Sequence, residues 1–264
     1  MRWLNPIMAA AALAASTAAQ ADGDAICADR PGKATATCTV PADAWQIESG
    51  IADWSLQRST GERDTALILG ETVVKYGLSD RTDIGIDLTP YVRISNRGDG
   101  GARVASAIGD LSIQLKHRLT GEQAPLQVAV LPVVTAPVAG HEIGAGAWQF
   151  GLLLPVGYSI PNSALSIALT PEFDLLPDAD GHGRHLAMAQ VAGLGWQASR
   201  KLTLSAELWG MWDWDPAGTT RQASVDGSAA YLLNKAVQLD AGANLGLNRQ
   251  TPDVEIYAGF SIRF

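Results

Sequence analysis

The last eleven residues constrain the fold more than any other part of the chain. Over residues 254–264, apolar side chains alternate strictly with polar or small ones. One face of this segment carries Val254, Ile256, Ala258, Phe260, Ile262 and Phe264. Alternation over about ten residues suits a strand with lipid on one side and a polar lumen on the other. A chain that ends on such a strand, with an aromatic last residue, is typical of bacterial outer-membrane β-barrels, although a soluble edge strand could end in the same way.

The N-terminal segment has the three parts of a secretory signal peptide. A positive start is followed by the apolar, Ala-rich run 7–19 and by the small-x-small sequence Ala19-Gln20-Ala21. The run is too short to span a bilayer. We therefore predict a signal peptide over residues 1–21, a mature chain that begins at Asp22, and a bacterial outer-membrane location. The partners expected there are outer-membrane lipid and the barrel-assembly machinery, which would recognise Phe260, Ile262 and Phe264.

Composition supports an exported β-protein and excludes one class of partner. Hydrophobic residues make up 47% of the chain, yet the mean hydropathy is only +0.07. That combination is expected when each strand contributes half of its residues to a polar face. The net charge of −8 gives no support to nucleic-acid binding.

Period-2 runs between turn signals predict an all-β, transmembrane antiparallel barrel of about twelve strands over residues 44–264. The expected strands are 44–56, 65–78, 81–94, 109–119, 125–137, 147–158, 163–174, 185–198, 201–213, 222–233, 236–247 and 253–264. Their connections alternate between tight turns and longer polar loops, and the longer loops include 57–64 and 95–108. Short periplasmic turns and longer external loops are the pattern of outer-membrane barrels.

Aromatic residues fall near the predicted strand ends, as expected at two membrane interfaces. Those at predicted periplasmic ends are Trp45, Tyr76, Tyr158, Trp196, Tyr231 and Phe264, and those near external ends are Trp54, Trp148 and Trp212. Core aromatics of a soluble sandwich would instead lie in the middle of strands.

Residues 22–43 precede the first strand and contain both cysteines. Cys27 and Cys38 lie in an exported segment, so the oxidising periplasm favours a disulfide between them. We expect residues 22–43 to form either a tail in the periplasm or a plug in the periplasmic mouth of the barrel. No metal site is expected, since no His lies nearby.

Several segments resemble one outer-membrane family, in the same order along the chain. Residues 74–85 resemble its Tyr-Gly-Leu hairpin, 108–116 its Gly-Asp…Lys strand, 204–210 its glutamate-containing strand, and 226–240 its Asp-Gly…Gln-Leu-Asp segment. The family is named for the meta-pathway of phenol degradation. The resemblance implies a barrel that transports aromatic or other hydrophobic compounds.

The resemblance also identifies five charged positions, which the predicted strands direct into the lumen: Asp110, Lys116, Glu207, Asp226 and Asp240. Two interpretations of these residues stay open. They form a structural ladder of charge pairs hidden from bulk water, or some of them select a permeant solute.

Twelve strands leave a narrow lumen, because lumen width grows with strand number. Tyr91, Trp209, Met211 and Tyr257 are expected to point inward and narrow it further. We therefore expect a channel for small, hydrophobic or aromatic solutes that uses no cofactor. A non-conducting structural or surface-display barrel is the alternative.

An outer-membrane hydrolase is the weakest alternative, because hydrolysis needs a nucleophile beside an oriented base. The one acidic-histidine cluster, over residues 178–185, is expected to form a solvated turn.

Overall fold

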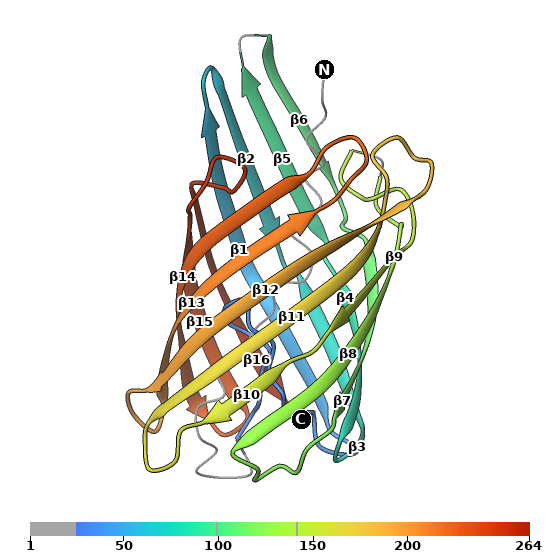
Figure 1. The fold of residues 1–264 in the computed structure, drawn as a ribbon. Helices are drawn as coiled ribbons and strands as arrows, with labels where there is room; N and C mark the ends of the chain where they lie inside the picture. Colours follow the sequence, from blue (N-terminus) through green and yellow to red (C-terminus); the bar gives the residue numbers. More distant parts are fainter. Residues whose placement is uncertain (1–24, 99, 141) are drawn as a thin grey trace.

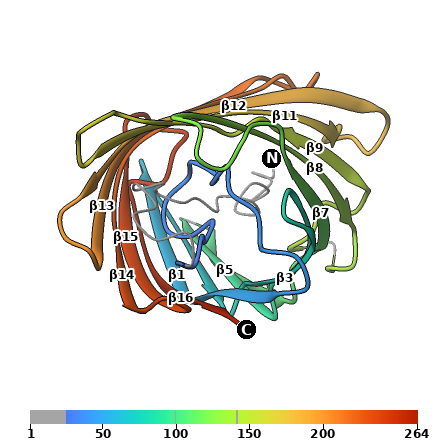
Figure 2. The same cartoon turned by 90° about the horizontal axis from the view of Figure 1, so that it is seen from below.

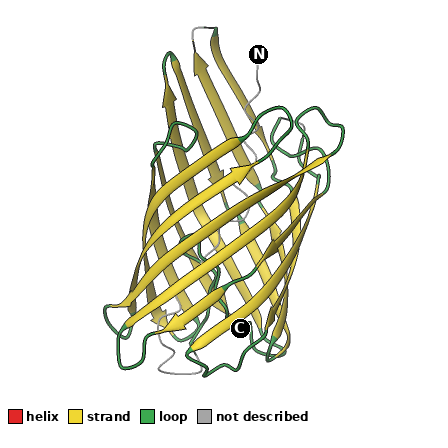
Figure 3. Ribbon diagram, in the orientation of Figure 1, coloured by secondary structure: helices red, strands yellow, loops and turns green. Residues whose placement is uncertain are grey.

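The structure is a computed structural model that describes residues 25–98, 100–140 and 142–264. The predicted signal peptide lies outside the described residues. The strands form one antiparallel sheet that closes on itself as a tilted barrel (Figures 1 and 3). Within the described part of the chain, no helix is long and apolar enough to cross a membrane.

Sixteen strand segments make up the sheet. They are β1 (Trp45–Ser59), β2 (Glu62–Leu69), β3 (Thr72–Ser79), β4 (Thr82–Leu88), β5 (Tyr91–Gly98), β6 (Gly101–Ala107), β7 (Leu111–Arg118), β8 (Leu126–Ala136), β9 (Gln149–Leu153), β10 (Val156–Ser159), β11 (Leu165–Pro177), β12 (Arg184–Gln197), β13 (Leu202–Asp213), β14 (Thr220–Asn234), β15 (Val237–Gly246) and β16 (Val254–Arg263).

These segments correspond to twelve barrel strands, as the sequence predicts. Four strands are each interrupted once, so β2 continues into β3, β4 into β5, β6 into β7 and β9 into β10. β1 pairs with both β2 and β3 along one edge, and β9 and β10 both pair with β8 and β11. The barrel closes where β1 pairs with β16, from Gln46↔Arg263 to Leu56↔Val254.

Three of the four interruptions occur at residues that disturb a β-ladder. Pro90 and Pro155 lack the N–H that a central strand would donate. Gly70 has a left-handed φ of +72°, which costs glycine little. Hydrogen bonds still cross the gap beside Gly70: Gly50 N–H donates to Glu71 O at 2.8 Å, and Gly70 N–H donates to Gly50 O at 2.9 Å. The breaks are therefore local bulges in continuous strands.

The outward face of the sheet is apolar and the inward face is polar, which is the reverse of a soluble barrel. Large apolar side chains such as Leu208, Ile256 and Phe264 are exposed on the outward face. Charged side chains lie inside, where Lys75 and Lys116 are 2% and 1% exposed. The closed barrel of about twelve strands, with an apolar exterior and a polar lumen, is confirmed.

The prediction of long loops at residues 57–64 and 95–108 is wrong, because most of these residues lie in paired strands. β1 and β2 extend through most of residues 57–64, and β5 and β6 form a hairpin that occupies most of residues 95–108. Both faces of these extensions carry polar residues, so the alternation on which the strand prediction relied is absent there. Backbone pairing continues nonetheless. In Figure 1 these hairpins rise above the rest of the barrel.

The predicted inward orientation of Tyr91 is also wrong. Tyr91 pairs with Leu69, and both side chains are exposed. Its neighbour Val92 pairs with the buried Ile68, which in turn pairs with Asp53. The break at residues 89–90 moves the following strand by one residue, and such a shift exchanges the faces of every side chain.

Exposed aromatic residues lie at both ends of the barrel. At the end with the short turns are Trp45, Tyr158, Trp196, Tyr231 and Phe264, and at the other end are Trp148 and Trp212. Phe264 is 70% exposed, and its backbone N–H donates to Trp45 O at 2.8 Å.

Candidate functional site

The lumen contains residues 25–43, which precede β1. Seen along the barrel axis, this segment lies inside the ring of strands (Figure 2). Its side chains include some of the most deeply buried in the chain, among them Ala34, Ala36 and Thr37. Backbone hydrogen bonds tie both ends to the wall: Ile26 N–H donates to Lys235 O at 2.7 Å, and Asp43 N–H donates to Gly77 O at 3.0 Å. We call residues 25–43 the lumen segment.

Cys27 and Cys38 are joined by a disulfide, with their Cα atoms 6.3 Å apart. The bridge packs with Ala36 in a small apolar cluster. It closes a loop that contains the charged residues Asp29, Arg30 and Lys33.

Asp29 is the first of three charged residues in the disulfide-closed loop that bind the lumen segment to the wall. Its carboxylate forms salt bridges with Lys75 of β3 and Lys116 of β7. Glu48 of β1 accepts a hydrogen bond from the Asp29 N–H at 2.8 Å and one from the Arg30 N–H at 3.2 Å, and it also pairs with Lys75. Burial alone would raise the pKa of the Asp29 carboxyl, but the ammonium groups of Lys116 and Lys75 together lower it below its ordinary value.

Arg30 forms the second anchor. Its guanidinium makes a two-pronged contact with Asp240 of β15, with Nη2–Oδ1 at 2.9 Å and Nε–Oδ2 at 3.3 Å. Gln238 of the same strand donates to Arg30 O at 2.9 Å. Both charged side chains are almost fully buried. The hydrogen bonds between them therefore replace those that each would form with water.

Lys33 forms the third anchor. Its Nζ lies 2.9 Å from Ser224 Oγ and 3.3 Å from Asp226 Oδ1, both on β14. The ammonium also lies 4.7 Å from the ring centroid of Trp209, within cation–π range. The backbone N–H groups of Lys33 and Ala34 donate to the Glu207 carboxylate at 2.7 and 3.4 Å.

Two glycines allow this close fit. At Gly32, where φ is +95°, a Cβ would lie 2.9 Å from Glu207 Oε1. At Gly77 of β3, a Cβ would lie only 1.8 Å from Pro41 O, so the wall and the lumen segment meet backbone to backbone. Only glycine allows that approach without displacing one of them.

Four of the five charged positions selected from the sequence contact the lumen segment: Lys116, Glu207, Asp226 and Asp240. Asp110 does not. Its carboxylate accepts hydrogen bonds from the N–H groups of Ala139 and Ala145, both at 2.9 Å, and holds the β8–β9 connection.

Sequence reasoning missed the other half of this network, namely Asp29, Arg30 and Lys33. Their signal was three charges within five residues of an otherwise small and apolar stretch, next to a barrel with an excess of inward carboxylates.

The acidic-histidine cluster has a structural arrangement. His185 Nδ1 is 2.9 Å from Asp178 Oδ1, and His185 Nε2 is 2.8 Å from Asp213 Oδ1, although the second contact lacks hydrogen-bond alignment. Both ring nitrogens thus face carboxylates rather than a nucleophile. Over the described residues, no group of three or more His, Cys, Asp or Glu side chains could hold a metal ion.

Comparison with known proteins places the chain in a family. The family model described as "Putative MetA-pathway of phenol degradation" matches residues 28–264. The chain therefore belongs to this family, which confirms the resemblance seen in the sequence. No curated protein matches the chain.

Solved structures share the fold at low sequence identity. The COG4313 outer membrane channel from Pseudomonas putida F1 is 15% identical, with a TM-score of 0.72, and the match covers 89% of this chain and 99% of that one. The NanC porin is 8% identical, with a TM-score of 0.51 and coverage of 83% and 98%. The β-domain of the Bordetella autotransporter BrkA is 16% identical, with a TM-score of 0.55 and coverage of 85% and 100%. This fold is that of outer-membrane channels, porins and translocators.

Proposed function

We propose that the protein is an outer-membrane channel for small hydrophobic or aromatic solutes, closed at rest by the lumen segment. The observation that carries the proposal is the network of Asp29, Arg30 and Lys33 with inward charges of the wall. In this interpretation, the inward charges at positions that resemble the family pattern bind the lumen segment, and the lumen segment closes the channel.

The exterior supports the location. An outward face of exposed aliphatic side chains, bordered by aromatic residues at both ends, suits a lipid environment. Removal of residues 1–21 by signal peptidase and assembly through Phe260, Ile262 and Phe264 complete the proposed route to the outer membrane.

The solute class is supported by the family description, which concerns phenol degradation, and by the lumen itself. Leu131, Val133 and Leu153 line a cavity beside the lumen segment and give it an apolar wall. A narrow, partly apolar passage suits a small aromatic molecule better than a hydrated sugar.

Uptake by intact cells tests the proposal. In a Gram-negative host that lacks its general porins, we expect expression of Arg30→Gln/Lys33→Gln, in which the lumen segment is released, to accelerate entry of radiolabelled benzyl alcohol but not of radiolabelled glucose, and expression of the wild type to do so to a smaller extent. The same host without the protein is the negative control. Equal benzyl alcohol uptake with and without the assembled barrel would contradict the proposal and favour a structural or display barrel.

A further inference from the structure

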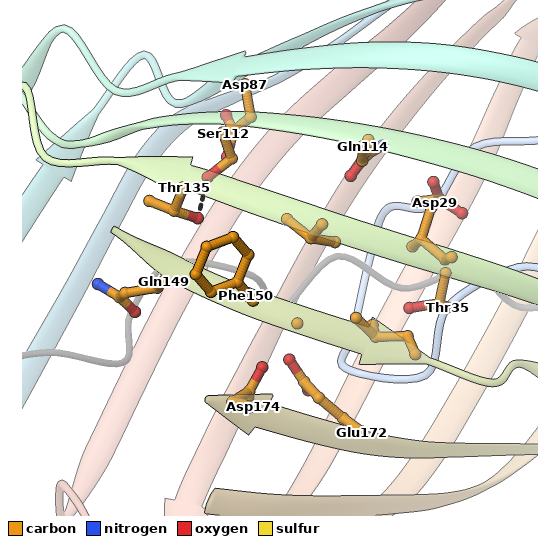
Figure 4. A pocket seen from close by; sticks show the side chains of 14 residues that line it. Asp29, Thr35, Asp87, Ser112, Gln114, Thr135, Gln149, Phe150, Glu172 and Asp174 are labelled. Carbon is orange, nitrogen blue, oxygen red and sulfur yellow. Dashed lines mark hydrogen bonds between the residues drawn. The ribbon is translucent and has the colours of Figure 1, made fainter. Parts of the chain in front are cut away.

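A cavity lies between the lumen segment and one side of the barrel wall (Figure 4). Its empty volume is about 670 Å³, including space open to solvent. Asp29 and Thr35 of the lumen segment form one boundary, and residues of β4, β7, β8, β9 and β11 form the other.

Strand pairing sets the pattern of the cavity wall. On β4, Asp87 is a direct neighbour of Ser112, which is a neighbour of Thr135. The hydroxyl groups of Ser112 and Thr135 hydrogen-bond each other at 2.8 Å. Polar groups therefore line this side of the cavity.

The opposite side is acidic, and an apolar strip lies between the two. On β11, Asp174 is a neighbour of Gly151, and Glu172 is a neighbour of Leu153. The apolar strip consists of Leu153 of β9 and of Leu131 and Val133 of β8, which pair with Leu153 and Gly151. Figure 4 shows Asp87 on one side of the cavity and Glu172 with Asp174 on the other.

No described Lys or Arg forms a salt bridge with any of these three carboxylates. Asp87 is 9% exposed, and its Oδ1 is buried without a hydrogen-bond partner among the described residues. Asp174 is 7% exposed and also lines the cavity. Burial of a carboxylate without a partner is costly, so a cation in the cavity would stabilise both groups.

We propose that this cavity binds an organic cation, namely an ammonium group attached to an apolar body. The carboxylates of Asp87, Glu172 and Asp174 would receive the ammonium, while Leu131, Val133 and Leu153 would contact the apolar part. A bare metal ion fits less well, because the apolar strip offers it no ligand and the described residues contain no metal-binding group of three.

Gly151 provides the space for such a ligand beside Asp174. A Cβ at Gly151 would lie 2.8 Å from Asp174 Oδ1 and 3.7 Å from Val133 Cβ. Gly151→Ala would therefore occupy part of the space beside Asp174 without removing a charged group, so it tests whether the ligand needs that space.

Equilibrium binding tests the proposal without any requirement for conduction, so its outcome is independent of the proposed channel. The mature full-length protein, refolded in detergent, is titrated calorimetrically with benzylammonium, benzyl alcohol, benzoate and Ca²⁺. Heat-modifiable mobility verifies the fold of each variant. Asp87→Asn with Asp174→Asn removes two cavity carboxylates, and Glu62→Gln with Asp64→Asn removes two from the exposed β1–β2 hairpin as the matched control.

We expect benzylammonium to bind at least about tenfold more tightly than benzyl alcohol or benzoate, as one charge-assisted contact would provide. The cavity double variant and Gly151→Ala should each weaken benzylammonium binding by about tenfold or more, and the hairpin variant by less than about twofold. Equal affinity for benzylammonium and benzyl alcohol, or full binding by the folded cavity variant, would overturn the proposal. Binding of Ca²⁺ that depends on Asp87 and Asp174 and excludes benzylammonium would also overturn it, in favour of a metal site.

Discussion

Replacement of Arg30 by Met should release the lumen segment while leaving the barrel folded. Arg30 and Asp240 are the most completely matched ion pair of the segment, with a guanidinium–carboxylate contact at 2.9 Å and side-chain exposures of 7% and 0%. Removal of one partner of such a buried pair costs about 3–5 kcal/mol, because the other charge stays buried alone. Water can reach Asp240 once the segment leaves, so the penalty applies to the docked state only.

The expected loss weakens docking between roughly 100- and 5,000-fold. Hydrogen–deuterium exchange followed by mass spectrometry measures it directly, since the N–H groups of Lys33 and Thr35 are bonded to Glu207 and Thr170 only while the segment is docked. We expect these amides to exchange faster by a comparable factor, with little change in β12 and β13.

Two variants provide controls for this experiment. Arg58→Met removes an exposed arginine that also lies 2.9 Å from a carboxylate, that of Asp253, and such surface pairs contribute about 0–1 kcal/mol. Asp240→Asn added to Arg30→Met removes the orphaned charge and should restore part of the protection. Acceleration of less than about fivefold in Arg30→Met, or an equal effect of Arg58→Met, would refute the reasoning.

Three further predictions follow from single contacts. Gly77→Ala should weaken docking of the lumen segment by about 1–3 kcal/mol, because the new methyl group would lie 1.8 Å from Pro41 O. Hydrogen exchange in residues 40–43 should therefore accelerate. The control Gly227→Ala, whose methyl group would have no atom within 4 Å, should leave exchange in these residues unchanged. Because the pKa of Asp29 is lowered, its contribution to docking is complete above the ordinary carboxyl value of 3.8 and is lost as the pH falls through the lower folded value. The difference in protection between the wild type and Asp29→Asn, taken relative to the intrinsic exchange rate at each pH, should therefore stay constant from neutral pH down to about pH 5, and a fall in that difference within this range would contradict the assignment. Deletion of Phe264 removes the bond to Trp45 O and should lower membrane assembly, so unchanged yield and heat-modifiable mobility would count against a role in assembly.

The barrel could be predicted from the sequence because its physical signal is local. Lipid outside and charge inside impose alternation on every strand, and the alternation fixes both the strand number and the outward face. The prediction failed where that contrast is absent, in the hairpins 57–64 and 95–108, and where a break at residues 89–90 exchanged the faces of Tyr91 and its neighbour.

The interior was only half predictable for a related reason. Alternation, together with the family resemblance, selected Lys116, Glu207, Asp226 and Asp240, but their partners lie in an irregular segment without periodicity. Arg30 and Asp240 are separated by 210 residues, and no local rule specifies such a pair. Charge balance was the remaining signal, since a surplus of inward carboxylates requires cations from elsewhere in the chain.

Single-channel recording in planar bilayers tests the central claim most directly, by comparing the mature protein with Arg30→Gln/Lys33→Gln and with the control Arg58→Gln. The gate that we propose predicts small or rare conductance steps for the wild type and the control, and larger or more frequent steps for the double variant. Identical conductance in all three proteins, or none in any of them, would contradict a channel closed by residues 25–43.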